Sequence, residues 1–221
     1  MKTSDSRSYI NLKIWIIPVL ALCVAGVSLF FLPESIPMQW GSNGQVNYYG
    51  SKYMILLWPV LGAALLLLGN IVPVLDPKGN QYEKFGKEYN LIHLLLLLFL
   101  LAMEVVTVLV SLGVQLKISV LVPLFMGAIL AVVGNFLPRI RQNYLTGIKT
   151  IWGYQNERVW NKTQRMAGRI WFGCGVLMML FAFFPWGHVT TLILIVVLLL
   201  VPRFYSYIQY EKEQSHPGSL E

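Results

Sequence analysis

Long stretches without charged residues constrain this chain more than any other feature. Five stretches lack Asp, Glu, Lys and Arg almost completely, and Glu104 is the one exception. The stretches are 14–33, 53–75, 89–116, 118–138 and 170–202. Each is long enough to cross the hydrocarbon core of a bilayer, which takes ~20 residues of helix. Only 12% of all residues are charged, whereas soluble domains carry about 25%. The sequence therefore predicts an all-α fold, a polytopic integral membrane helical bundle.

The last stretch, 170–202, is too long for a single crossing. The turn-forming sequence Pro185-Trp186-Gly187-His188 lies near its middle, and Pro and Gly mark turns. It is predicted to form two short helices joined by a hairpin, which gives about six transmembrane helices. The alternative is five, with 170–202 as one long tilted helix or a re-entrant pair.

The positions of the basic residues predict the orientation of the chain. With the N-terminus inside, all but two of the 17 Lys and Arg residues fall on the inner side, the exceptions being Lys52 and Lys117. Inner loops of membrane proteins are enriched in Lys and Arg. Both termini are therefore expected to be cytoplasmic, and the net charge of +7 is attributed to topology rather than to direct nucleic-acid binding.

These predictions divide the chain into six segments. They are a cytoplasmic N-terminus 1–13, a helix pair 14–75 with an outer loop 33–52, an inner loop with helices three and four at 76–138, a basic aromatic cytoplasmic loop 139–169, helices five and six at 170–202, and a cytoplasmic tail 203–221.

No motif of an enzyme or a metal site is present in the sequence. Zinc-binding His-Glu-x-x-His, the Gly-x-Ser-x-Gly elbow and the phosphate loop are all missing. Cys23 and Cys174 both fall inside predicted spans, where they are expected to be packing residues. We therefore expect a protein without catalytic activity, cofactor or metal.

Three polar residues lie within or at the ends of predicted spans. Glu104 is near the centre of its span, where an acid is costly and commonly functional. It is either part of a proton or ion relay or a protonated residue bonded to a neighbouring helix. Asn70 and Asn135 each follow a Gly and precede a Pro by three residues at the inner end of a span. We expect them to form a paired clamp between helices, since Gly permits close approach and Asn bonds across helices.

Two loops are richer in sequence features than a simple connector requires. The outer loop has prolines, glycines, Trp40 and two tyrosines. It is either an aromatic anchor at the lipid headgroups or a structured cap that meets something arriving from outside. The inner loop places seven basic residues among Trp and Tyr. It either binds anionic lipid headgroups or docks a cytosolic protein, and residues 157–169 are expected to form a short interfacial helix.

Both loops resemble a known bacterial family. The stretch GNFLPRIRQNYLTGIKTIWGYQNERVWNKTQRMAG is similar to the signature of SdpI-type membrane proteins. The matching residues are Gly134, Asn135, Asn143, Tyr144, Gly147, Ile148, Thr150, Trp152, Glu157, Trp160, Arg165 and Gly168. The outer loop resembles an uncharacterised N-terminal domain often joined to that family. It matches at Leu32, Pro33, Ile36, Pro37, Trp40, Gly44, Ser51 and Lys52.

The chain departs from the family pattern at four positions. Lys149 stands where Arg is usual and Ile151 where Pro is usual, while Gln39 and Gln164 replace a frequent His. Loss of these His residues weakens any metal or proton role there. Lys149 keeps the charge but lacks the bidentate fork of Arg.

The resemblance implies an immunity protein that protects against a secreted antibacterial toxin of the sporulation-delay type. It also implies signalling, in which a cytosolic transcriptional repressor is held at the membrane. The residues expected to face a peptide or protein toxin are Pro33, Ile36, Pro37, Trp40 and Lys52. Those expected to face the cytosolic partner are Asn143, Gly147, Lys149, Thr150, Trp152, Glu157, Trp160 and Arg165. The alternatives are a small proton- or ion-coupled transporter that uses Glu104, and a membrane enzyme.

Overall fold

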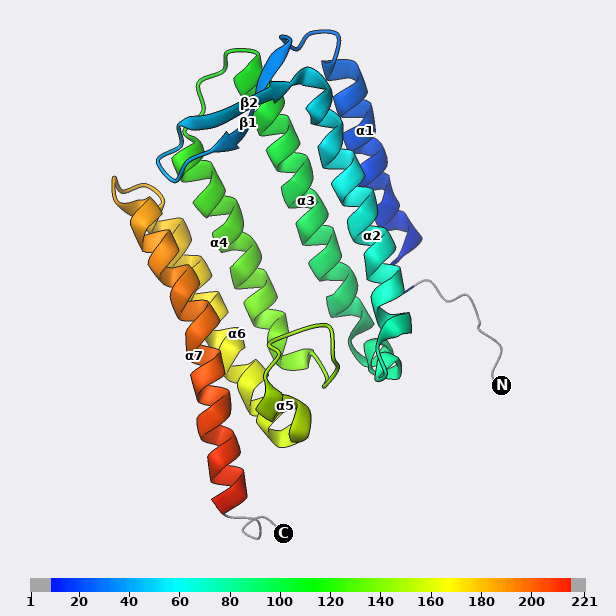
Figure 1. Ribbon diagram of the computed structural model, residues 1–221, viewed down its shortest axis with the longest axis vertical. Coiled ribbons are helices and arrows are strands. Elements are labelled where there is room, and N and C mark those ends of the chain that lie inside the picture. The colour runs from blue at the N-terminus through cyan, green and yellow to red at the C-terminus, as the bar shows by residue number, and fades with distance from the viewer. Residues whose placement is uncertain (1–8, 216–221) are drawn as a thin grey trace. The chain divides into compact units, whose positions relative to one another are not determined.

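The computed structural model describes residues 9–215. The first eight residues of the expected cytoplasmic N-terminus and the last six of the expected tail lie outside them. The described chain is almost entirely helical and consists of two compact units (Figure 1). The all-α membrane fold that the apolar stretches predict is confirmed.

The first unit contains residues 1–39 and 46–115, of which those from 9 onward are described. Its three α-helices are α1 (Ile16–Ser28), α2 (Leu57–Leu75) and α3 (Gly86–Ser111). The 3₁₀ segments Leu12–Trp15, Lys52–Leu56 and Gly79–Phe85 precede them. The buried residues of α1 recur every three or four positions and are small or compact, namely Pro18, Ala21, Ala25 and Ser28. This spacing gives α1 one flat face that contacts α2 and α3.

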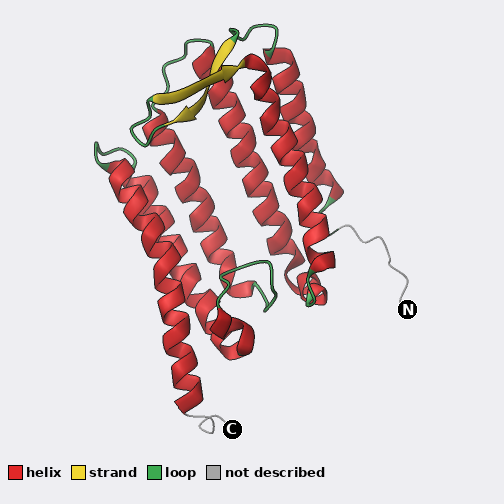
Figure 2. Cartoon of the chain, viewed as in Figure 1, coloured by secondary structure: helices red, strands yellow, loops and turns green. Residues whose placement is uncertain are grey.

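A two-stranded antiparallel sheet forms the loop between α1 and α2 (Figure 2). Its strands are β1 (Ser35–Trp40) and β2 (Val46–Ser51), a hairpin that the sequence analysis did not expect. Ile36 of β1 is fully buried and packs with Ala25, Leu32 and Ile55. The turn, residues 40–45, groups with the second unit. Gly44 in this turn has a φ of 81°, a conformation that favours glycine.

The second unit contains the hairpin turn and residues 116–215 of the described chain. Its helices are α4 (Ile118–Phe136), the 3₁₀ turn Leu137–Arg139, α5 (Ile151–Gln155), α6 (Glu157–Phe181) and α7 (Gly187–Ser215). Helices α4, α6 and α7 lie side by side (Figure 1). The stretch 170–202 thus belongs to two helices, with the chain turning between Phe181 and Gly187.

Glycines bring α4 and α6 into direct backbone contact. A Cβ added to Gly127 would lie 2.6 Å from the carbonyl oxygen of Gly175, and one added to Gly175 would lie 2.4 Å from that of Gly127. Gly134 and Gly168 make the same kind of contact one step further along. Small residues permit this approach, which increases dispersion contacts where lipid weakens the hydrophobic drive between helices.

The expectation of a separate short helix over 157–169 is wrong. These residues form the first half of α6, which continues without interruption to Phe181. The change from basic to apolar sequence at Arg169 and Ile170 is a change of surroundings only. No proline interrupts the helix there, and Gly168 faces α4 rather than ending the helix.

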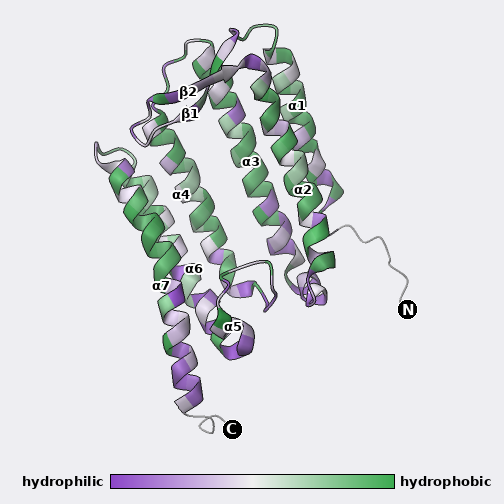
Figure 3. Cartoon of the chain, in the orientation of Figure 1, coloured by the Kyte–Doolittle hydropathy of each residue, from purple (hydrophilic) through white to green (hydrophobic). Residues whose placement is uncertain are grey.

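Four helices within residues 9–215 are long and apolar enough to cross a membrane. They are Lys52–Leu75, Gly79–Ser111, Ile118–Arg139 and Gly187–Ser215, counted with adjoining 3₁₀ turns. Figure 3 shows apolar residues along these helices and a hydrophilic C-terminal end on α7. The apolar helix Leu12–Ser28 is shorter, and α6 is apolar mainly beyond Arg169. The total of six crossings stays a prediction.

Candidate functional site: two folded loop regions and a buried acid

The basic aromatic loop folds into a compact element in the second unit. We call this element the loop platform and define it as residues 140–155 with the first half of α6, 157–169. Trp160 of α6 is fully buried, and its indole Nε1 donates to the carbonyl oxygen of Ile140 at 3.0 Å. This hydrogen bond joins the start of the loop to α6.

Gln164, one turn further along α6, holds the middle of the loop. Its Oε1 accepts from the backbone N–H of Ile148 at 3.2 Å, and its Nε2 donates to the Ile148 carbonyl oxygen at 3.0 Å. The adjacent Gly147 has a φ of 95°, and a Cβ there would lie 3.1 Å from the Gln164 amide oxygen. Gln164 is fully buried, so this side chain replaces the backbone partner that Ile148 would find in regular secondary structure.

Asn143 and Thr150 organise the loop's two turns. The Asn143 Oδ1 accepts from the backbone N–H groups of Leu145 at 3.0 Å and Thr146 at 2.6 Å, an Asx-type turn. Thr150 caps α5 by accepting from the Gly153 N–H at 3.0 Å. Its hydroxyl also bonds to the Ser206 hydroxyl of α7 at 2.7 Å. The loop platform is thereby attached to both α6 and α7.

The predicted partner-facing residues of this loop thus fall into two groups. Asn143, Thr150 and Trp160 are buried, and Gly147 is half-buried; these residues form the frame of the loop platform. Lys149, Glu157 and Arg165 are exposed, and Trp152 is half-buried with its ring 5.2 Å from that of Tyr207.

The exposed rim of the loop platform also carries apolar side chains that the sequence analysis did not single out as site residues. Ile151 is 69% exposed, and Tyr144 and Leu145 are 41% exposed. They surround Lys149 in the sequence. A surface that combines a cation with exposed apolar groups is suited to contact a protein or a lipid headgroup region.

The first and last elements of the loop signature meet in space. Gly134 contacts the backbone of α6 next to Gly168, and Asn135 lines a hollow that Arg165 also lines. Asn135 is exposed. Asn70 belongs to the first unit, where its Oδ1 accepts from the Ile10 N–H at 3.1 Å and its Nδ2 donates to the Leu66 carbonyl oxygen at 3.0 Å. The clamp between Asn70 and Asn135 stays a prediction.

The hairpin residues expected to face a toxin differ in exposure. Ile36 and Pro37 are buried, and Pro33 is exposed. Lys52 pairs with Glu34 across the base of the hairpin at 2.8 Å. Ile36 and Pro37 therefore hold the hairpin on the helices, and Trp40 is left as the half-buried residue at the turn.

A pocket of about 240 Å³ lies beside the hairpin turn in the second unit. We call it the hairpin pocket. Trp40 and Ser42 of the turn line it together with residues of α4 and α7, among them Ser119, His188 and Thr191. The Trp40 indole N–H is buried and has no hydrogen-bond partner within the described residues. His188 was noted in the sequence only as part of a turn, because nothing in its neighbourhood indicated contact with the hairpin.

Glu104 lies in the first unit and is fully buried on α3. Neither carboxylate oxygen has a hydrogen-bond partner in residues 9–215, so no bond to a neighbouring helix is seen. His93 of the same helix bonds through Nδ1 to the Tyr89 carbonyl oxygen at 2.8 Å and stacks on the Tyr89 ring at 4.4 Å. Glu104 and His93 are separated by about 16 Å along the helix, so they form no direct pair.

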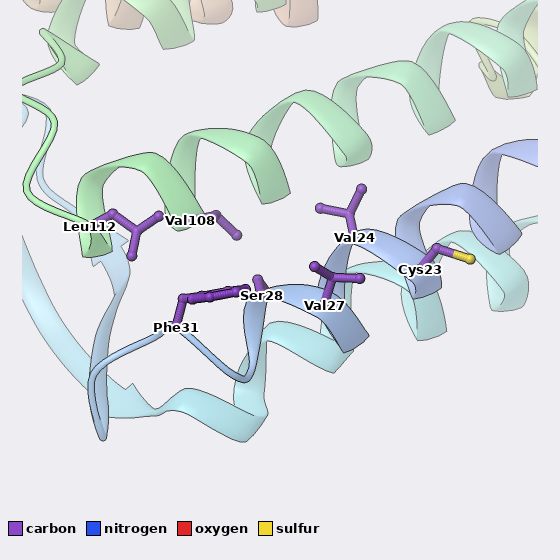
Figure 4. A pocket seen from close by; sticks show the side chains of 7 residues that line it. All are labelled: Cys23, Val24, Val27, Ser28, Phe31, Val108 and Leu112. Atoms are coloured by element: carbon purple, nitrogen blue, oxygen red, sulfur yellow. The ribbon is translucent and has the colours of Figure 1, made fainter.

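An apolar hollow of about 420 Å³ lies close to Glu104 in sequence and on the same two helices (Figure 4). It is lined by Cys23, Val24, Val27, Ser28, Phe31, Val108 and Leu112. No cluster of three or more His, Cys, Asp or Glu suited to a metal occurs in the described part of the chain.

These features define a multi-pass helical membrane protein with two folded loop regions. Residues 139–206 match the model of the SdpI/YfhL protein family, and residues 15–63 match a domain of unknown function, DUF1648. The chain is 28% identical over 203 residues to the immunity protein SdpI of Bacillus subtilis (strain 168), which covers 89% of this chain and 96% of that protein. No solved structure matches. The resemblance that the two loops predict is confirmed, and the chain is a membrane protein of the SdpI type.

Proposed function

We propose that this chain is a membrane immunity protein that protects its cell against a secreted antibacterial toxin of the sporulation-delay type. The similarity to an immunity protein over nearly the full length of both chains carries this proposal. That similarity includes both loop regions, since separate family models match around each of them.

The hairpin pocket is the proposed toxin contact. It is predicted to lie on the outer side, and its lining combines apolar side chains with Trp40, Ser42 and His188. The buried Trp40 indole N–H lacks a partner within the described residues, and an unpaired buried donor gains by meeting an acceptor. An extended segment or side chain of the toxin that brings an acceptor into the pocket fits this chemistry.

The test is a protection assay in a bacterium sensitive to the sporulation-delay toxin. Cells expressing the chain are challenged, and membrane potential and survival are followed. Protection by the wild type and its loss in Trp40→Ala or His188→Ala supports the proposal. The matched control is Tyr49→Ala, because Tyr49 is exposed on β2 and does not line the pocket. No protection by a correctly inserted wild type contradicts it.

We further propose that the loop platform signals by holding a cytosolic repressor at the membrane. The exposed rim around Lys149 and Ile151 is the proposed contact, since the buried frame is inaccessible to a partner. Lys149→Ala and Ile151→Ser are expected to abolish co-sedimentation of the repressor with membranes while leaving insertion unchanged. Gln155→Ala, exposed on α5, is the control. Retained co-sedimentation in both rim variants contradicts this part of the proposal.

The second candidate function is a small proton- or ion-coupled transporter. The observation that favours it is the buried carboxyl of Glu104, which has no hydrogen-bond partner in residues 9–215, since ionisable groups within membranes often serve ion or proton pathways. Glu104→Gln separates the two candidates. The immunity function tolerates this change, whereas a transporter that uses the carboxyl loses its activity.

A further inference from the structure

A second hollow in the second unit, of about 480 Å³, lies between the C-terminal end of α4 and the middle of α6. We call it the arginine pocket. Asn135 and Pro138 line one side, and Arg165, Arg169 and Phe172 of α6 line the other. Gly134 and Gly168, which bring the two helices together, complete the lining.

The charge of the arginine pocket is positive and uncompensated. Arg165 and Arg169 are four residues apart on α6, so their side chains lie on the same side about 6 Å apart along the axis. No acidic residue lines the pocket, and within residues 9–215 neither guanidinium pairs with a carboxylate. Guanidinium groups bind phosphate oxygens through two parallel hydrogen bonds. An exposed Asn135 amide on the facing helix adds a further donor.

The pocket also spans the boundary between polar and apolar surface. Arg169 is the last basic residue of α6, and the helix is apolar from Ile170 onward. Phe172, which is 50% exposed, lines the apolar side of the pocket. A phosphate that carries acyl chains suits such a site, because its headgroup meets the arginines while its chains follow the apolar wall. Free phosphate gains nothing from that wall.

We propose that the arginine pocket binds the phosphate group of an anionic phospholipid of the inner leaflet. Basic pockets between membrane helices on the cytoplasmic side commonly hold such headgroups. The site is independent of the proposed function, since it rests on residues of α4 and α6 alone and requires neither toxin nor repressor. It gives Asn135, Arg165 and Gly168 of the loop signature a shared role that a protein-docking loop does not explain.

The experiment measures lipid binding to the purified full chain by native mass spectrometry in detergent. Phosphatidylglycerol and phosphatidylcholine with the same acyl chains are titrated separately. The wild type is expected to prefer phosphatidylglycerol by roughly 30-fold, since each basic side chain near anionic lipid contributes on the order of fivefold. The double variant Arg165→Gln/Arg169→Gln is expected to lose this preference. The matched control Arg141→Gln/Arg203→Gln removes the same charge from exposed sites outside the pocket and is expected to keep it.

Three results would overturn the proposal. These are no preference in the wild type, an equal loss in the control, or displacement of phosphatidylglycerol by excess inorganic phosphate, which would indicate a free-anion site. If the double Gln variant fails to elute as a monodisperse species, Arg165→Lys/Arg169→Lys takes its place. This variant keeps the charge but loses the bidentate fork, so its preference is expected to fall between those of the wild type and parity; an unchanged preference would also overturn the proposal.

Discussion

Gly134 of α4 and Gly168 of α6 are in reciprocal backbone contact. A Cβ on Gly134 would lie 2.8 Å from the Gly168 carbonyl oxygen, and a Cβ on Gly168 would lie 2.6 Å from the Gly134 carbonyl oxygen. Both distances are shorter than a Cβ tolerates against backbone. The two residues open and close the loop signature in the sequence, so this contact fixes where the loop platform begins and ends.

Gly168→Ala is expected to lower the stability of the protein in detergent. The added methyl group forces α4 and α6 apart, and overpacking of this kind costs typically about 1–3 kcal/mol. The measurement is the midpoint of unfolding in a denaturing-detergent titration. Gly173→Ala is the control, since nothing lies within 4 Å of a Cβ at Gly173 on the same helix. An equal midpoint for both variants would show that the helices separate freely.

Gln164→Leu is expected to loosen the loop platform. The substitution leaves the N–H and the carbonyl of Ile148 without their partners, and each unpaired buried group costs about 1–3 kcal/mol. The rate of trypsin cleavage at Arg141 and Lys149 is expected to rise. Gln155→Leu, exposed on α5, serves as the reference variant. Unchanged cleavage in Gln164→Leu would mean that the loop holds its shape by other contacts.

Thr150 and Ser206 are expected to be energetically coupled. Their hydroxyl groups lie 2.7 Å apart in a buried position, and neighbours of this kind show interaction energies of about 0.5–3 kcal/mol. The cycle combines Thr150→Val and Ser206→Ala and follows unfolding in detergent. Pairing Thr150→Val with Thr191→Val should be additive, because the Thr191 hydroxyl bonds to Gly187 at the other end of α7. Additivity in both cycles would argue that the hydroxyl contact contributes nothing.

Glu104→Met is expected to stabilise the protein. Met has nearly the length of Glu and no group to desolvate, whereas the buried carboxyl has no hydrogen-bond partner among the described residues. Burial of an unsatisfied polar group costs about 1–3 kcal/mol. The unfolding midpoint should rise, while Glu211→Met, at an exposed position of α7, should leave it unchanged. A fall in the midpoint would reveal a partner for Glu104 that stabilises it in the folded protein.

The sequence was most informative where a residue type has one physical consequence. Uncharged apolar stretches predict helices that cross lipid, and Pro185 and Gly187 correctly marked the turn between α6 and α7. The hairpin was missed because its strands are short and contain Pro37 and Gly50, residues that weaken a strand prediction.

The remaining differences concern residues whose role depends on a distant partner. Gln164 was judged by the loss of a His, yet the structure shows both ends of its amide bonded to Ile148. Gly168 resembled a helix end, although it is a contact with α4. The approach of His188 to the hairpin turn depends on the ends of α4 and α7 lying near that turn in the fold, and no pattern along the chain records that arrangement.

Helix α6 has a mechanical consequence because it runs unbroken from the loop platform through its apolar half. Its 25 residues make a rod about 37 Å long. A tilt of about 5° around its midpoint moves each end by roughly 1.5 Å in opposite directions, an estimate that follows from the rise per residue. Such a lever needs no change in its own hydrogen bonds to carry a push at Phe181 to Trp160, so displacement rather than unfolding is the form in which a signal would cross the membrane.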